Sequence, residues 1–181
     1  MGANMANINR SIKFLRIVVV TALVLLLTAH FWFWLSPYSF DFITLDHAIL
    51  DDYGGIEALN AKQKLLGFAI SSVPLLAMLW SLVLLFRLTT ILAAGQWFDR
   101  LCEDYCIKVG RWLVIYVVLD IAHRTALVGA ITMENQPGNR HFAISFSSDD
   151  LLALVPALLA LIIGHMVRLA REQQDELNEI I

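Results

Sequence analysis

The chain has 181 residues, of which 59% are hydrophobic and 16% are charged, and its formal net charge is −3. A soluble globular domain carries about 25% charged residues, and a mean hydropathy of +0.68 is too high for such a domain. The acidic total also gives no sign of the basic surface that binds nucleic acid. The composition therefore argues against a soluble enzyme and against direct nucleic-acid binding, and it indicates a membrane protein.

Four apolar runs are each close in length to a membrane-spanning helix. A span needs about 20 mainly apolar residues, with about 17 as the lower limit. The runs cover residues 17–35, 65–86, 112–131 and 151–167. We therefore predict an all-α membrane protein, a single four-transmembrane-helix bundle over residues 1–181, with helices at about 14–35, 65–87, 110–132 and 150–168.

The first run follows three cationic residues, Arg10, Lys13 and Arg16, as the apolar part of a signal peptide does. It is too long for a signal peptide, and the stretch 29–40 around its far end, AHFWFWLSPYSF, has no cleavage site between small residues. Its aromatic end is typical of the belt that anchors a helix at a membrane interface. We interpret this run as a retained first helix.

The distribution of Lys and Arg predicts which ends of the helices face the cytoplasm. Cytoplasmic loops carry an excess of these residues. With the N-terminus inside, Lys62, Lys64 and Arg140 lie outside, Arg124 lies within a helix, and the other nine of the 13 lie inside. We therefore predict that both termini are cytoplasmic. The outside segments are then 36–64 and 133–149, the cytoplasmic loop is 88–109 and the tail is 169–181.

The second outside segment combines a Pro-Gly turn with short alternating stretches in MENQPGNRHFAISFSSDD. Such a pattern favours a small β-hairpin-like element outside the membrane. Ser147 or Ser148, followed by Asp149 and Asp150, then provides the N-cap and the acidic first turn of the last helix.

The cytoplasmic loop contains an amphipathic stretch. Gly95 is expected to end the second helix, and residues 98–109 then read as a short helix lying at the membrane surface. The tail after the last helix is acidic and ends in two apolar residues. As a hypothesis, both segments form a docking surface for a cytoplasmic partner, with Phe98, Leu101, Tyr105, Ile180 and Ile181 as its contact residues.

The third helix carries three polar residues in its middle: Asp120, His123 and Arg124. For a span of 111–131 the midplane of the membrane falls near Asp120, where one Asp or Arg costs ~2.5–3.5 kcal/mol. Asp120 and Arg124 are four residues apart, so they can pair along one helix face. Tyr116 falls on the same stripe, which we expect to face the interior of the bundle.

Other helices place polar residues at a similar depth: His30 in the first helix, and Ser71 and Ser72 in the second. These residues and the stripe predict one polar cluster inside the bundle. Such a cluster can simply fix the packing of the helices. It can also be a hydrated pocket that binds a ligand or senses a condition, because charges inside a membrane often mark functional sites. A redox role, with haem held by His30 and His123, is a further alternative.

Two cytoplasmic segments carry a family resemblance. In AAGQWFDRLCEDYCIKVGRWLV, Gly95 and Phe98 are followed by Gly110, which opens a helix. The end of the chain, ISFSSDDLLALVPALLALIIGHMVRLAREQQDELNEII, has a strand-like stretch, a capped apolar helix and an acidic tail ending in Ile. Together they resemble the YoaS-like bacterial membrane proteins, domain-of-unknown-function family 2975. The resemblance implies four helices, the inner membrane of a bacterium and a small helix-turn-helix regulator as partner. It implies no catalytic residues.

The sequence lacks the common motifs of enzymatic chemistry. The sequence has no Gly-rich phosphate loop, no nucleophile elbow and no metalloprotease motif. Cys102 and Cys106 lack the spacing of a zinc site. We therefore predict a non-enzymatic sensing, regulatory or scaffolding protein with no catalytic residue, metal or cofactor. It acts through its loop and tail, is surrounded by lipid and is either a monomer or a homo-oligomer. The alternative is a small transporter or a haem-binding redox protein that uses the pocket around Asp120, His123 and Arg124.

Overall fold

A computed structural model describes residues 2–35, 50, 55–97, 99–132 and 148–179. These residues form four long helices, α1 (Gly2–Leu35), α3 (Ala61–Ala93), α4 (Arg100–Thr132) and α5 (Ser148–Glu179), and one short 3-10 helix, η1 (Ile56–Ala58). Each long helix is long and apolar enough to cross a membrane. For the described residues, the predicted all-α architecture with four helices of membrane-spanning length and apolarity is therefore confirmed. The predicted β-hairpin-like element lies almost wholly in 133–147, outside the described residues.

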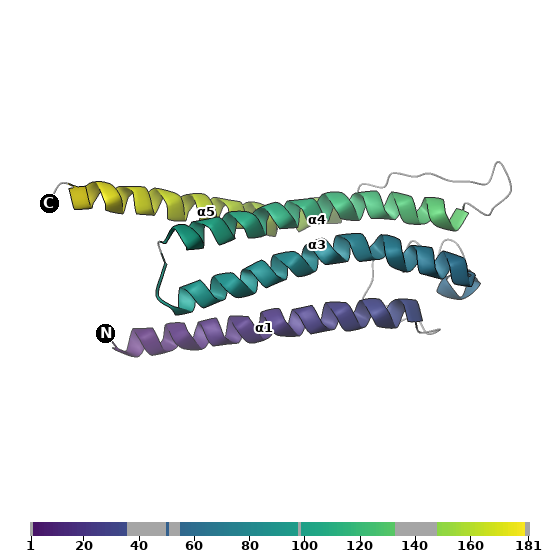
Figure 1. The fold of residues 1–181 in the computed structure, drawn as a ribbon, viewed down its shortest axis with the longest axis horizontal. Coiled ribbons are helices and arrows are strands. Elements are labelled where there is room, and N and C mark those ends of the chain that lie inside the picture. The colour runs from purple at the N-terminus through teal and green to yellow at the C-terminus, as the bar shows by residue number, and fades with distance from the viewer. Residues whose placement is uncertain (1, 36–49, 51–54, 98, 133–147, 180–181) are drawn as a thin grey trace.

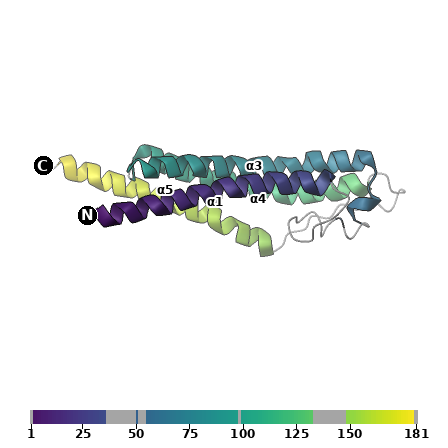
Figure 2. The same ribbon diagram turned by 90° about the horizontal axis from the view of Figure 1, so that it is seen from below.

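The four helices run lengthwise beside one another (Figure 1). Helix α3 packs against both α1 and α4, and α4 packs against α5. The N-terminus, the C-terminus and the short connection from α3 to α4 lie at one end of the bundle (Figures 1 and 2). We call this the terminal end. At the opposite end of the bundle, α1 ends at Leu35, α3 begins at Ala61 and α4 ends at Thr132. We call this the connection end.

The prediction of a separate surface helix over 98–109 is wrong, because the 33 residues of α4 run without a break from Arg100 to Thr132. Gly110, expected to open a new helix, instead permits close packing against α5. A Cβ atom added there would lie 2.6 Å from Leu161 Cγ and 2.9 Å from the carbonyl oxygen of Ala157. No proline interrupts this stretch, and Cys102, Cys106 and Val109 are buried. The amphipathic pattern therefore reflects helix packing inside the bundle.

Helix α3 begins four residues before the predicted start at 65, because a capping box stabilises its first turn. The backbone N–H of Gln63 donates to Asn60 Oδ1 at 2.9 Å, and the backbone N–H of Asn60 donates to Gln63 Oε1 at 2.9 Å. Two orphan N–H groups of the helix end are satisfied in this way. At the other end, Gly95 has a φ of 79°, which ends the helical stretch where the sequence suggested.

Helix α5 is displaced lengthwise toward the terminal end. Asp150 in its first turn contacts Arg124, which lies eight residues, or about 12 Å, before the end of α4. Further along, Gly164 lies against Cys106 and Ile107. The C-terminal turns of α5 therefore project beyond the other helices (Figures 1 and 2). The predicted tail continues this helix as far as Glu179.

The outer faces of the bundle are strongly apolar. The most apolar windows of α1 and α5 are only 11% and 17% buried. Soluble monomers rarely expose apolar patches of this extent, so these faces suit contact with lipid chains. A buried apolar cluster near the connection end joins α1, α4 and the segment before α3, and Phe68 of α3 packs against it. Its members are Phe33, Trp34, Leu50, Ile56, Leu59, Leu127 and Ile131.

Candidate functional site

The predicted pairing of Asp120 with Arg124 is present. Arg124 Nε donates to Asp120 Oδ2 at 3.1 Å, and Nη2 of the same guanidinium donates to the same oxygen. Both residues are buried, with exposed fractions of 9% for Asp120 and 8% for Arg124. Because the two residues lie one helical turn apart, α4 needs no other helix to bring them together.

A third member of this site, Asp150, was not predicted. Arg124 Nη1 donates to Asp150 Oδ2 at 3.5 Å, and Nη2 also pairs with Asp150 Oδ1. Asp150 is only 2% exposed, whereas its neighbour Asp149 is exposed. The sequence suggested a helix-capping role for both acids, and nothing in it distinguished the one that turns inward. Arg124 thus bridges carboxylates of α4 and α5.

His123 completes the site. Its Nδ1 lies 3.7 Å from Asp120 Oδ1, and the residue is 6% exposed. We call Asp120, His123, Arg124 and Asp150 the Arg124 cluster. It holds two carboxylates and one guanidinium, so its net charge is −1 when His123 is neutral and zero when His123 is protonated. Tyr116, also predicted here, is half-buried one turn before Asp120.

The Arg124 cluster joins different parts of the apolar runs of α4 and α5. In α5 the whole apolar run, 151–167, lies between Asp150 and Arg168. The 18 residues from Asp150 to Arg168 cover about 27 Å, close to the ~30 Å thickness of the hydrocarbon layer. Asp150 therefore lies at the start of the apolar part of α5, whereas Asp120 and Arg124 lie within the apolar run 112–131 of α4. The position of Asp120 near the midplane stays a prediction.

His30 and Ser72 form a second polar contact, between α1 and α3. His30 Nε2 lies 3.1 Å from Ser72 Oγ. The Ser72 hydroxyl donates its hydrogen to the carbonyl oxygen of Phe68 at 2.6 Å, so His30 must donate through Nε2–H. The His30 ring also packs on the Phe68 ring at a centroid distance of 4.9 Å. This contact helps to hold α1 on α3.

The predicted set of polar residues thus divides between helix interfaces. His30 and Ser72 join α1 to α3, and the Arg124 cluster joins α4 to α5. Ser71 is buried and donates to the carbonyl oxygen of Gly67 at 2.6 Å. Haem ligation by His30 and His123 stays a prediction. Among the residues that the structure describes, no three His, Cys, Asp or Glu side chains are grouped to hold a metal ion.

A second interhelical ion pair lies at the terminal end. Arg171 Nη2 of α5 donates to Glu103 Oε2 of α4 at 3.0 Å, and Glu103 is 9% exposed. No pattern in the sequence pairs these two residues, because their contact depends on the lengthwise placement of α5. Helix α5 is therefore tied to α4 near both ends of their contact, by a buried ion pair at Arg124 and a partly buried one at Glu103.

The predicted docking residues have different surroundings. Leu101 is 49% exposed. Tyr105 packs against a buried cluster that contains Leu88, Cys102 and Cys106, so part of its surface is already used by the fold. Phe98, Ile180 and Ile181 lie outside the described residues.

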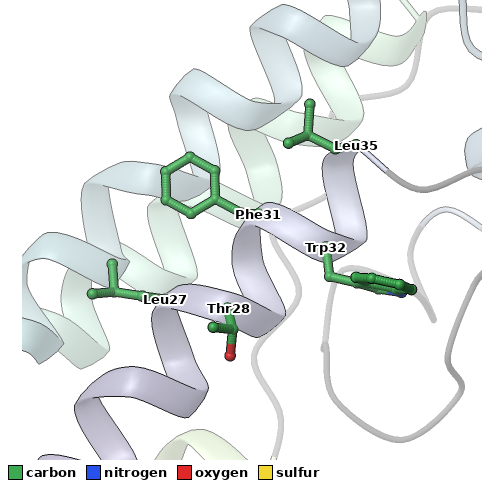
Figure 3. A pocket seen from close by; sticks show the side chains of 5 residues that line it. All are labelled: Leu27, Thr28, Phe31, Trp32 and Leu35. Carbon is green, nitrogen blue, oxygen red and sulfur yellow. The ribbon is translucent and has the colours of Figure 1, made fainter.

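Near its C-terminal end, α1 borders an open apolar hollow of about 530 Å³. Figure 3 shows the five α1 side chains that line it, Leu27, Thr28, Phe31, Trp32 and Leu35. The Thr28 hydroxyl donates to the carbonyl oxygen of Val24 within the helix at 2.9 Å. The lining is therefore almost wholly hydrocarbon, and no residue of the Arg124 cluster belongs to it.

Comparison with known proteins adds no relative to this picture. No family model, no curated protein and no solved structure matches the chain. The function of the protein is therefore inferred from its fold, from the Arg124 cluster and from the two ion pairs that join α5 to α4.

Proposed function

We propose that the protein is a non-enzymatic membrane signalling module in which α5 carries a change at the Arg124 cluster to the cytoplasmic tail. One observation carries this proposal: ion pairs tie α5 to α4 near both ends of their contact. The pair of Asp150 with Arg124 is buried, and the pair of Arg171 with Glu103 is partly buried. An ion pair is a switchable contact, because a change of one charge turns attraction into the cost of an unpaired buried charge.

The shape of α5 supports transmission along the helix. Its 32 residues form one helix of about 48 Å. Gly110 and Gly164 bring its middle close to α4, and it projects past the other helices at the terminal end. A shift of its first turn therefore displaces its last turns, in the manner of the small helix shifts that couple distant sites in many proteins.

The proposed orientation places the terminal end in the cytoplasm, following the excess of Lys and Arg there. The resemblance to YoaS-like proteins suggests the inner membrane of a bacterium and a small helix-turn-helix regulator as the partner. Exposed Leu101 and the projecting acidic turns 172–179 offer the surface that such a partner would bind.

Single-cysteine labelling tests this orientation in a background with Cys102→Ala and Cys106→Ala. We expect an impermeant maleimide to label Lys62→Cys in intact cells, because Lys62 is exposed at the connection end. We expect Gln173→Cys, exposed on α5, to be labelled only after lysis. The reverse pattern would show that the termini face outward.

Removal of the projecting turns should abolish partner binding while the membrane fold is kept. Deleting 172–181 keeps Arg171 and its bond to Glu103, so insertion and thermal stability should stay close to wild type. Recovery of a regulator by affinity purification from native membranes should fall to background.

The matched control changes Glu172, Asp175 and Glu176 to Gln and keeps the helix length. Loss of the partner in this control too would assign binding to the acidic charges. Equal recovery with the deleted and the full-length chain would remove the tail from the proposal.

A further inference from the structure

We propose that the Arg124 cluster binds one exchangeable proton on His123, and that this proton decides whether the first turn of α5 stays attached to α4. The inference rests on the proposed function, because it names the input of the same module. That input is the proton concentration on the connection side of the membrane.

The charge count of the cluster leads to this inference. Asp120, Arg124 and Asp150 are each at most 9% exposed, and the two carboxylates share one guanidinium. A buried site with an unbalanced charge is expensive unless a proton neutralises it. Imidazole is the side chain that ordinarily gains a proton between about pH 5 and 8. Uptake of one proton by His123 brings the net charge of the cluster to zero.

The geometry gives this proton a specific effect on Asp150. Both hydrogen bonds from Arg124 to Asp120 reach Oδ2, whereas His123 Nδ1 faces Oδ1 at 3.7 Å. A protonated His123 can therefore neutralise Asp120 from the other side. The guanidinium is then free to satisfy Asp150. With neutral His123, both carboxylates compete for Arg124. Protonation thus favours the attached state of α5, and loss of the proton favours its release.

Within the part of the chain that the structure describes, the other ionisable groups near the cluster favour His123 as the proton site. From its own helix, α4, Asp120 and Arg124 face it, and from α5 Asp150 faces the same guanidinium. In α3, no residue between 65 and 86 ionises. In α1, the corresponding group is His30, which is bonded to Ser72. Exposed Asp149 lies beside Asp150 and marks a short path from water to the site.

Distance measurements by pulsed electron paramagnetic resonance test this proposal on the full chain in lipid nanodiscs. One pair of spin labels replaces exposed Ala126 of α4 and Leu152 of α5 in the cysteine-free background. A control pair replaces Leu76 of α3 and Val118 of α4, which are also exposed. We expect one short distance for the first pair at about pH 5 and a growing longer component toward about pH 8.

The ratio of the longer to the shorter component should change about tenfold, which corresponds to about 1.4 kcal/mol. The control pair should not change. His123→Gln, which cannot be protonated, should show the distribution of high pH throughout. His123→Lys should show the distribution of low pH. Identical wild-type distributions at both pH values would overturn the proposal, and so would an unaltered titration in His123→Gln.

A single label at Gln173 separates this inference from the proposed function. If the 126–152 distance follows pH and the mobility of the label at 173 does not, the proton site stands and transmission to the tail fails. If the tail responds to pH while the 126–152 distance is constant, the proton site is wrong.

Discussion

Arg124→Leu is expected to destabilise the folded protein by about 3–5 kcal/mol, the usual effect of removing one partner of a buried ion pair. The change leaves Asp120 and Asp150 buried without the guanidinium that bridges them. Thermal unfolding in detergent and the yield of monodisperse protein measure the effect. Arg168→Leu is the matched control, since Arg168 forms a solvent-exposed pair with Glu172 and its loss should change little.

The bridging role of Arg124 makes a further prediction about compensation. An apolar replacement of a complete buried pair is often close to neutral. If Arg124 paired with Asp120 alone, changing both residues to Leu would restore stability. Because Asp150 also depends on Arg124, we expect that double variant to stay unstable, and the addition of Asp150→Asn to restore most of the loss. A double variant as stable as wild type would show that Asp150 does not need Arg124.

Gly110→Leu is expected to separate α5 from α4 over the middle of their contact. Even a Cβ atom at this position would lie 2.9 Å from the backbone oxygen of Ala157, which cannot move aside as a flexible side chain can. Overpacking of this kind typically costs about 1–3 kcal/mol. Thermal unfolding should show the loss, and both ion pairs of α5 should weaken with it.

Ala122→Leu adds three carbon atoms, one fewer than Gly110→Leu, on an exposed part of α4 and serves as the control. It should leave unfolding unchanged. Gly164→Ala should be milder than Gly110→Leu, because the nearest atom to its new Cβ is Ile107 Cγ1 of a side chain, at 2.8 Å. Wild-type stability of Gly110→Leu would mean that α5 lies further from α4 than the structure describes.

The number of helices could be predicted from the sequence, because lipid requires long apolar runs and the chain has four of them. The helix ends could not be predicted as well. Hydropathy marks the part of a helix that lies in lipid, whereas hydrogen bonding and packing set where the helix itself ends. Asn60 and Gln63 extend α3 beyond its apolar run. Helix α4 extends beyond its apolar run to Arg100, and Gly110 packs against α5 inside this longer helix.

The same distinction explains what could be predicted of the Arg124 cluster. The spacing of Asp120 and Arg124 within one helix determines their contact, so the sequence reveals it. The contacts of Asp150 with Arg124 and of Arg171 with Glu103 depend on how far α5 is shifted along α4. That shift results from packing over the whole length of both helices, and no local pattern in the sequence encodes it.

The bridge through Arg124 also has a consequence for the order in which the protein is made. The ribosome completes α4 before α5, so Arg124 first meets only Asp120, in a neutral pair within one helix. The helix can enter the bilayer without an unpaired charge, whatever becomes of the segment that follows. Asp150 arrives afterwards and joins a guanidinium that is already in place. The contact between Asp150 and Arg124 therefore forms only after the pair within α4 is complete, and the insertion of α4 does not depend on it.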